Sequence, residues 1–187
     1  MGSQYYNSLV SAVIDASRSK HWEEAVTEWD IVDWEEDENC ESSCICGKES
    51  IRYLYTIRNR ETGIILYPIG SSCIKKFGRS DFAEKISIYE GMFKLYRAVR
   101  NNDMIELTSE YFSRKLLLQL YNDGAFAPTQ YNHYNGVFDY RFMRDMFNKH
   151  DKSNITDAQR RKIRAIIGFS IKPYLQRNLK YKSAQSL

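Results

Sequence analysis

The fold is decided by residues 44–77, which read CICGKESIRYLYTIRNRETGIILYPIGSSCIKKF. Two runs in this stretch, 51–57 and 64–67, are rich in β-branched and aromatic residues, which favour strands. The loop between them, 58–63, has Asn and Gly in turn positions, so the stretch predicts a β-hairpin. A Pro and a Gly end the second strand, and a serine pair then favours the start of a short helix over 71–77.

The cysteines form the second pattern, and all four lie in or just before this stretch: Cys40, Cys44, Cys46 and Cys73. Cys44-Ile45-Cys46-Gly47 resembles a zinc knuckle, in which two thiolates converge on an ion and the glycine lets the backbone turn. Cys73 falls in the first turn of the expected helix, where the helix dipole favours a thiolate. A knuckle, a hairpin and a ligand at a helix start are the layout of the treble-clef zinc fold.

The fourth ligand is left open by the spacing. Cys40 is the nearest spare thiol and gives an all-cysteine set, with His21 as the runner-up through a neutral imidazole nitrogen. Four thiolates leave no open position, so the expected cofactor is a structural Zn²⁺. With three protein ligands the ion could hold a water and be reactive. The alternative is four reduced cysteines, some buried as small hydrophobes.

The remainder of the chain has mainly helical patterns. Apolar spacing and capping residues predict helical structure over 4–28, a short strand over 30–34, and helices from Ser80 to Arg100, from a Thr108 cap to Tyr121, from Asp139 to Asn148, and from a Thr156 cap onward with an interruption at Gly168. We therefore expect an α+β fold with three parts. These are an N-terminal helical segment (1–29), a zinc-stabilised hairpin module (30–79) and a helical region with a basic C-terminal helix (80–187).

Charge is unevenly distributed although the net charge is only +3. Residues 22–43 hold ten acids and no Lys or Arg, whereas residues 141–187 hold twelve Lys or Arg and three acids. The basic surface could meet nucleic acid, and a solvated helix face is the plain alternative. The candidate nucleic-acid contacts are Arg58, Arg60, Lys75, Lys76, Arg160, Arg161 and Arg164.

One family resemblance covers most of the chain. The motifs C-x-C-G, Y-T-I-R-N, T-G and P-I-G-S-x-C-I-x-x-F within 44–77 resemble an uncharacterised zinc-site family of bacteriophages and bacterial mobile elements. The segments 121–126, 139–142 and 145–149 are similar to the helical part of that family. The resemblance carries over Cys44, Cys46 and Cys73 as ligands. It implies a mobile-element context, where small proteins often handle nucleic acid or disarm host defence nucleases.

Three functions from different classes follow. The leading expectation is a non-enzymatic, zinc-stabilised protein that binds nucleic acid or a nucleoprotein complex in the cytoplasm of a bacterial host cell. The first alternative is an inhibitor of a host defence nuclease, of the anti-CRISPR type, acting through the acidic residues of 23–41 or through the basic face. The second alternative is a metal-dependent nuclease using His133 and Asp139, although Asp139 is also expected as a helix N-cap.

Other classes lack their signals. The sequence has no Gly-rich phosphate loop, no nucleophile elbow, no signal peptide and no apolar run long enough for a membrane span. We therefore expect neither a nucleotide cofactor nor a membrane partner.

Overall fold

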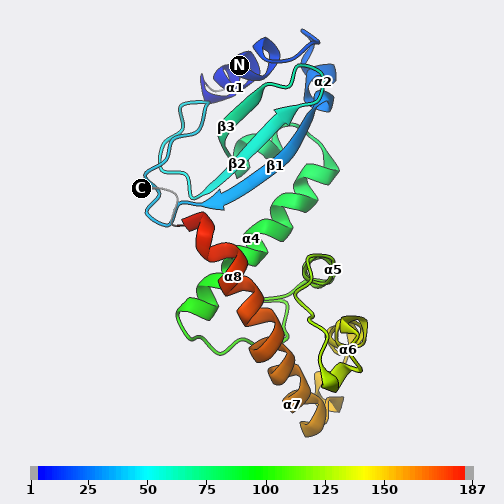
Figure 1. Cartoon of the computed structure of the whole chain (residues 1–187). Coiled ribbons are helices and arrows are strands. Elements are labelled where there is room, and N and C mark those ends of the chain that lie inside the picture. Colours follow the sequence, from blue (N-terminus) through cyan, green and yellow to red (C-terminus); the bar gives the residue numbers. More distant parts are fainter. Residues whose placement is uncertain (1–3, 184–187) are drawn as a thin grey trace. The chain divides into compact units, whose positions relative to one another are not determined.

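The structure, a computed structural model, describes residues 4–183 and has an α+β architecture, as the sequence predicts (Figure 1). A three-stranded antiparallel sheet with short helices occupies the N-terminal part, and the remainder is mainly helical. The chain divides into two compact units. The first holds the residues up to Ser87 together with those from Lys182, and the second is Ile88–Tyr181. Segments 1–29 and 30–79, expected as separate parts, both lie in the first unit.

The sheet has the strand order β1-β2-β3, with β1 at Trp29–Glu36, β2 at Tyr53–Asn59 and β3 at Ile65–Gly70. The expected hairpin is therefore confirmed as β2 and β3, displaced by one to three residues at its strand ends. The candidate strand at 30–34 is also confirmed, as the longer β1, which pairs with β2.

The pairing register shifts once in each of the two strand pairs. Ile31 pairs with Ile57 and Asp33 with Thr56, so Val32 is an extra residue that forms a bulge and is left exposed. A second irregularity lies in β3 around Pro68, which has no N–H for a ladder. The Pro68 carbonyl accepts a hydrogen bond from Ile45 N–H, which joins the cysteine loop to β3.

Helices α1 (Gln4–Asp15) and α2 (Trp22–Ala25) and a 3₁₀ turn (Val26–Glu28) precede the sheet. Within 4–28, where we expected helical structure with a second short helix starting near Ser19, residues 16–21 are not helical and the second helix begins at Trp22. There the carboxylate of Glu28 accepts hydrogen bonds from the backbone N–H groups of Arg18 and Ser19 at 2.8 Å. These bonds satisfy the backbone outside a helix and hold the chain in a turn.

A buried polar network ties this turn to the sheet. Asn59 is fully buried, donates to Glu28 Oε2 at 2.8 Å, and accepts from the N–H groups of Glu61 and Thr62. Trp29 Nε1 donates to the Ser17 hydroxyl at 2.9 Å. Because buried polar groups are costly when unpaired, this network fixes how the first helix joins β1 and β2.

Helices α3 (Ser71–Lys75) and α4 (Ser80–Arg100) follow the sheet, and the boundary between the two units falls within α4. The second unit then contains α5 (Arg114–Asn122), α6 (Gly136–Asn148), α7 (Asp157–Ile166), a π-helical turn (Ile167–Ile171) and α8 (Lys172–Ser183), with 3₁₀ turns at Gln130–Asn132 and Lys152–Asn154. The Thr156 cap is confirmed: Thr156 and Gln159 form a capping box. The π turn lies where Gly168 predicted an interruption.

Two predicted helix starts were wrong. Thr108 lies in a turn, and α5 begins six residues later, where the Ser113 hydroxyl accepts from Leu116 N–H. Asp139 lies inside the first turn of α6, and the N-cap is Asn135, whose side chain accepts from Val137 N–H. In both cases a nearby polar residue had the right backbone conformation and took the capping role.

Candidate metal centre

The cysteine loop supplies two of the three clustered thiols. Gly47 N–H donates to the Cys44 carbonyl at 2.8 Å, and Cys44 N–H donates to the Lys48 carbonyl at 2.8 Å. These bonds close a tight turn in which Gly47 has φ +90°, a backbone conformation that favours glycine. Cys44 and Cys46 consequently project from one turn, as the knuckle pattern predicted.

Cys73 provides the third thiol from α3. The hairpin returns the chain to the cysteine loop, and Cys73 lies one turn into the helix that follows β3. The sulfur atoms of Cys44, Cys46 and Cys73 all lie within 4.8 Å of one another, and those of Cys46 and Cys73 are 3.4 Å apart. Each of the three is at most 4% exposed, so these residues form a buried three-thiol cluster.

Hydrogen bonds perturb the titration of these thiols. The pKa of Cys44 falls to about 5, chiefly because the Cys73 thiol donates a hydrogen bond to it, while the N–H groups of Cys46 and Gly70 act in the same direction. The contact with Cys44, together with burial, raises the pKa of Cys73. Three crowded sulfurs cannot all become thiolates without a cation among them, and a metal ion would supply that charge.

The donor set matches a thiophilic metal. In tetrahedral zinc coordination with bonds of about 2.3 Å, sulfur ligands lie roughly 3.8 Å apart, which is compatible with this cluster. Magnesium and calcium prefer oxygen donors. The residues therefore could hold a soft or borderline metal ion, with Cys44, Cys46 and Cys73 as its ligands.

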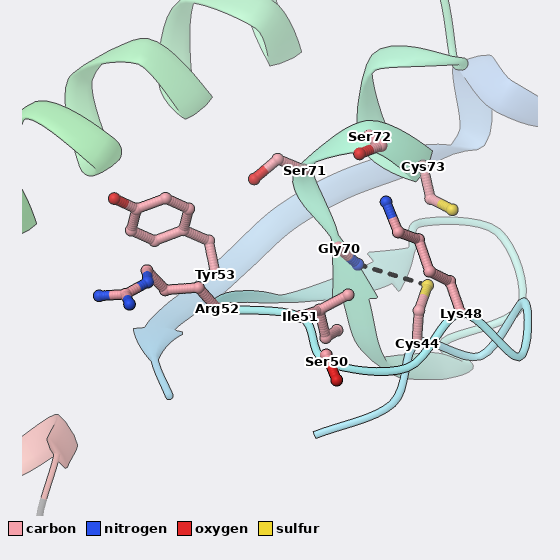
Figure 2. A pocket seen from close by; sticks show the side chains of 10 residues that line it. All are labelled: Cys44, Lys48, Ser50, Ile51, Arg52, Tyr53, Gly70, Ser71, Ser72 and Cys73. Atoms are coloured by element: carbon pink, nitrogen blue, oxygen red, sulfur yellow. Dashed lines mark hydrogen bonds between the residues drawn. The ribbon is translucent and has the colours of Figure 1, made fainter. Parts of the chain in front are cut away.

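A cavity of about 200 Å³ adjoins the cluster (Figure 2). Cys44 and Cys73 line it together with the side chains of Lys48 and Ser72. The dashed line in Figure 2 marks the hydrogen bond from Gly70 N–H to the sulfur of Cys44, 3.4 Å long. The cluster is thus buried on the protein side and adjoins a small cavity on the other.

Neither predicted fourth ligand joins the cluster in the part of the chain that the structure describes. Cys40 is half-buried and lies beside Arg52. Burial lowers the pKa of Arg52, but its interactions with Cys40 and Glu36 outweigh burial and leave the pKa raised. His21 is exposed and precedes α2. The Asp37 carboxylate accepts from three backbone N–H groups of residues 39–42 and so fixes the turn that holds Cys40.

The predicted nucleic-acid contacts fall into two groups, which belong to different units. Lys75, Lys76 and Arg58 of the first unit are exposed, while Arg60 is paired with Asp30 at 3.5 Å. Arg160, Arg161 and Arg164 are all exposed on α7 of the second unit. The two groups are therefore treated as separate surfaces.

The pair expected to carry nuclease chemistry is not assembled as a catalytic pair. Asp139 is buried and faces Asn132 and Lys162, at 2.8 and 3.4 Å. His133 is exposed, has a left-handed backbone conformation, and packs edge-on against Phe138. The Asn132–Asp139–Lys162 group was not predicted from the sequence, since its members come from a 3₁₀ turn and two different helices.

Comparison with known proteins adds no relative: no family model, no curated protein and no solved structure matches this sequence. Across the described residues, the helices are too short or too polar to cross a membrane.

Proposed function

We propose that this protein is a zinc-stabilised, non-enzymatic binding protein that contacts nucleic acid through the exposed arginines of α7. The observation that carries the proposal is the α7 face itself, formed by Arg160, Arg161 and Arg164. The apolar side of the same helix, with Ile163 and Ile166, is buried, so the arginines are held outward. Within the described residues, no carboxylate forms an ion pair with any of the three.

Such a face suits a phosphate backbone. Guanidinium groups bind phosphate oxygens in a bidentate manner, and a row of them on one helix gives sequence-independent, salt-sensitive binding. The resemblance of residues 44–77 to a mobile-element family supports the same class of partner. Lys75 and Lys76 form a second, smaller basic edge, although Lys76 also lies over the ring of Tyr6.

The metal in this proposal is zinc, and its role is structural. The order of cysteine loop, hairpin and α3 supports a treble-clef-like layout, in which one ion would join the cysteine loop to α3. A hairpin of this size is marginal alone, so an ion at this point stabilises the whole first unit.

The acidic residues of 23–41 give less support to the alternative function, an inhibitor that mimics DNA, than the α7 arginines give to nucleic-acid binding. Glu28 and Asp37 accept several hydrogen bonds within the chain, and Glu36 is buried beside Arg52 at 3.5 Å. Glu35 accepts from the hydroxyl of Tyr67. These contacts give the segment a structural role, and no observation favours mimicry over it.

Salt-dependent binding tests the proposal. Fluorescence anisotropy with a labelled single-stranded DNA, titrated at several salt concentrations, should give an affinity that falls steeply with salt. The double variant Arg160→Glu, Arg161→Glu should weaken binding and reduce the slope by about 0.7 for each phosphate that is no longer neutralised. A matched variant, Arg141→Glu with Arg144→Glu, makes the same change in net charge on α6.

The two variants distinguish an effect of the α7 arginines on binding from an effect of the protein's net charge. If the α6 variant weakens binding as much as the α7 variant, the effect belongs to overall charge and the α7 assignment is wrong. If the wild-type protein binds neither DNA nor RNA at low salt, the nucleic-acid proposal fails.

A further inference from the structure

The largest cavity described in the second unit has no role in the proposed function. Its volume is about 690 Å³, within the range typical of small-molecule sites. It lies between the loop before α6 and the last turns of α7 with the π turn that follows, and its lining includes Tyr131, Asp139, Lys162, Ala165 and Phe169. Figure 1 shows α6 and α7 next to one another in this unit.

A buried carboxylate lines this cavity. Asp139 is 5% exposed; Oδ2 accepts from Asn132 Nδ2 at 2.8 Å, and Oδ1 lies 3.4 Å from Lys162 Nζ. A carboxylate has about four acceptor positions, so these two partners leave it able to accept from a ligand. Among the described residues of this unit, every buried polar side chain either lines this cavity or bonds to one that does: Asn132, Asp139 and Ser170.

Asn132 holds the carboxylate in place. Its Oδ1 accepts from Thr129 N–H at 2.7 Å, and its Nδ2 also donates to the Ala127 carbonyl at 2.9 Å. Lys162 is oriented by the ring of Phe142, 4.7 Å from its Nζ. The polar end of the cavity is therefore preorganised, as binding sites require.

Two aromatic side chains that line the cavity are largely exposed to solvent. Tyr131 is 82% exposed and Phe169 is 85% exposed, and both line the cavity. Large apolar side chains at such exposure gain little from folding. They come from the 3₁₀ turn at Gln130–Asn132 and from the π turn, and π turns are frequent at functional sites.

The charged and aromatic side chains that line the cavity exclude several classes of ligand. A small cation would meet Lys162, and a bare anion would meet Asp139. An aliphatic ligand would leave both charged groups without new partners. A planar ring with N–H donors stacks on the aromatic side chains, donates to the carboxylate, and places an attached phosphate near the cations of α7.

We propose that this cavity binds one unpaired nucleobase with an exocyclic amino group, namely adenine, cytosine or guanine, from a single strand. Tyr131 and Phe169 stack on the base, Asp139 accepts from its amino group, and Arg161 and Lys162 face the adjoining phosphate. This inference rests on the proposed nucleic-acid function and gives it a substrate class, single-stranded nucleic acid.

The test compares strands and variants. Anisotropy with dA₁₂, dC₁₂ and dT₁₂ should show tighter binding to the first two, because thymine has no amino group. Tyr131→Ala and Phe169→Ala should each weaken dA₁₂ binding by about 5- to 150-fold. Tyr134→Ala is the matched control, since Tyr134 is 74% exposed three residues from Tyr131 but does not line the cavity. Asp139→Asn should remove most of the preference over dT₁₂.

A second experiment tests the mononucleotides AMP and TMP alone. Their binding is measured from chemical-shift changes in nuclear magnetic resonance spectra of the protein. If both aromatic variants bind dA₁₂ as the wild type does while the α7 arginine variant does not, the cavity assignment is overturned and the proposed function stands. If AMP binds and Tyr131→Ala abolishes it, but no strand binds, the base site stands and the proposed function is overturned. Absence of binding in both arms overturns both.

Discussion

Replacing Cys46 by serine should remove the metal and destabilise the first unit, whereas Cys40→Ser should do neither. The two substitutions make the same chemical change in one loop, six residues apart. Cys46 is 3% exposed with its sulfur 3.4 Å from that of Cys73, while Cys40 lies outside the three-thiol cluster. Comparing Cys46→Ser with Cys40→Ser therefore distinguishes the loss of a metal ligand from the general effect of replacing a sulfur by an oxygen.

The magnitude follows from the number of ligands. Structural zinc binds small protein sites with about 10–16 kcal/mol, or roughly 3–4 kcal/mol for each of four ligands, so loss of one thiolate weakens affinity by about 10²–10³-fold. Zinc at about 1,000 times its dissociation constant stabilises the fold by about 4 kcal/mol, of which about 0.4–1.4 kcal/mol remains in the variant, so the loss is about 3–4 kcal/mol. For a chain of this size that is a fall in Tm of roughly 6–16 °C.

The assay is metal content by plasma mass spectrometry, combined with thermal unfolding in the presence and absence of a chelator. Chelator should lower the Tm of the wild type and of Cys40→Ser to near that of Cys46→Ser. It should lower the Tm of Cys46→Ser by much less, because little of the zinc stabilisation remains in that variant. A packing defect alone would lower the Tm of Cys46→Ser and leave it sensitive to chelator.

Two results would refute the reasoning. Full metal content in Cys46→Ser would show that the three-thiol cluster is not the site. Equal loss of metal in Cys40→Ser would show that Cys40 ligates the ion and that the loop held by Asp37 rearranges around it.

Three further outcomes concern stability. Gly136→Ala should destabilise the second unit by about 3 kcal/mol or more in chemical unfolding, because a Cβ there would lie 1.9 Å from the Phe126 carbonyl oxygen; wild-type stability would contradict the packing of the start of α6. Asn59→Ala should cost about 3 kcal/mol, since three hydrogen bonds of a fully buried side chain are removed, and a cost below about 1 kcal/mol would show that water replaces them. Stability should also fall on acidification. Burial raises the pKa of Glu28, but the hydrogen bonds from Asn59 and two backbone N–H groups outweigh it and leave the pKa below its ordinary 4.5. Its contribution is therefore intact above about pH 4.5 and lost as the pH falls through the lowered value. Glu28→Gln should make the decline shallower, and an unchanged acid transition would contradict this role.

The parts of the fold that depend on neighbours in sequence were predictable. Runs rich in β-branched and aromatic residues predicted β2 and β3, and the spacing of Cys44, Cys46 and Cys73 predicted that three thiols would meet. A hairpin fixes where its two ends lie, so residues before and after it can be placed together without knowing the rest of the chain.

The parts that depend on competition between residues were not predictable. Asp139 and Asn135 are both good caps four residues apart, and sequence alone does not rank them. The structure favours Asn135 because Gly136 fits against the Phe126 carbonyl, where a side chain would not, and this places Asp139 inside the helix and against Asn132. The placement of the cavity's carboxylate thus follows from one packing interaction, between Gly136 and the loop at Phe126.

The carboxylates of Glu28, Asp37 and Asp139 differ in how many hydrogen bonds they accept within the chain, and this difference separates structural from binding roles. Glu28 accepts from two backbone N–H groups and one amide, and Asp37 accepts from three backbone N–H groups and a hydroxyl. Both are used to hold a turn. Asp139 has one short hydrogen bond and one ion pair at 3.4 Å, and it lines a cavity of about 690 Å³. Because each oxygen of Asp139 has a single partner, the carboxylate can accept a further donor from a ligand in the cavity. Of these three carboxylates, Asp139 is therefore the one that ligand binding explains best.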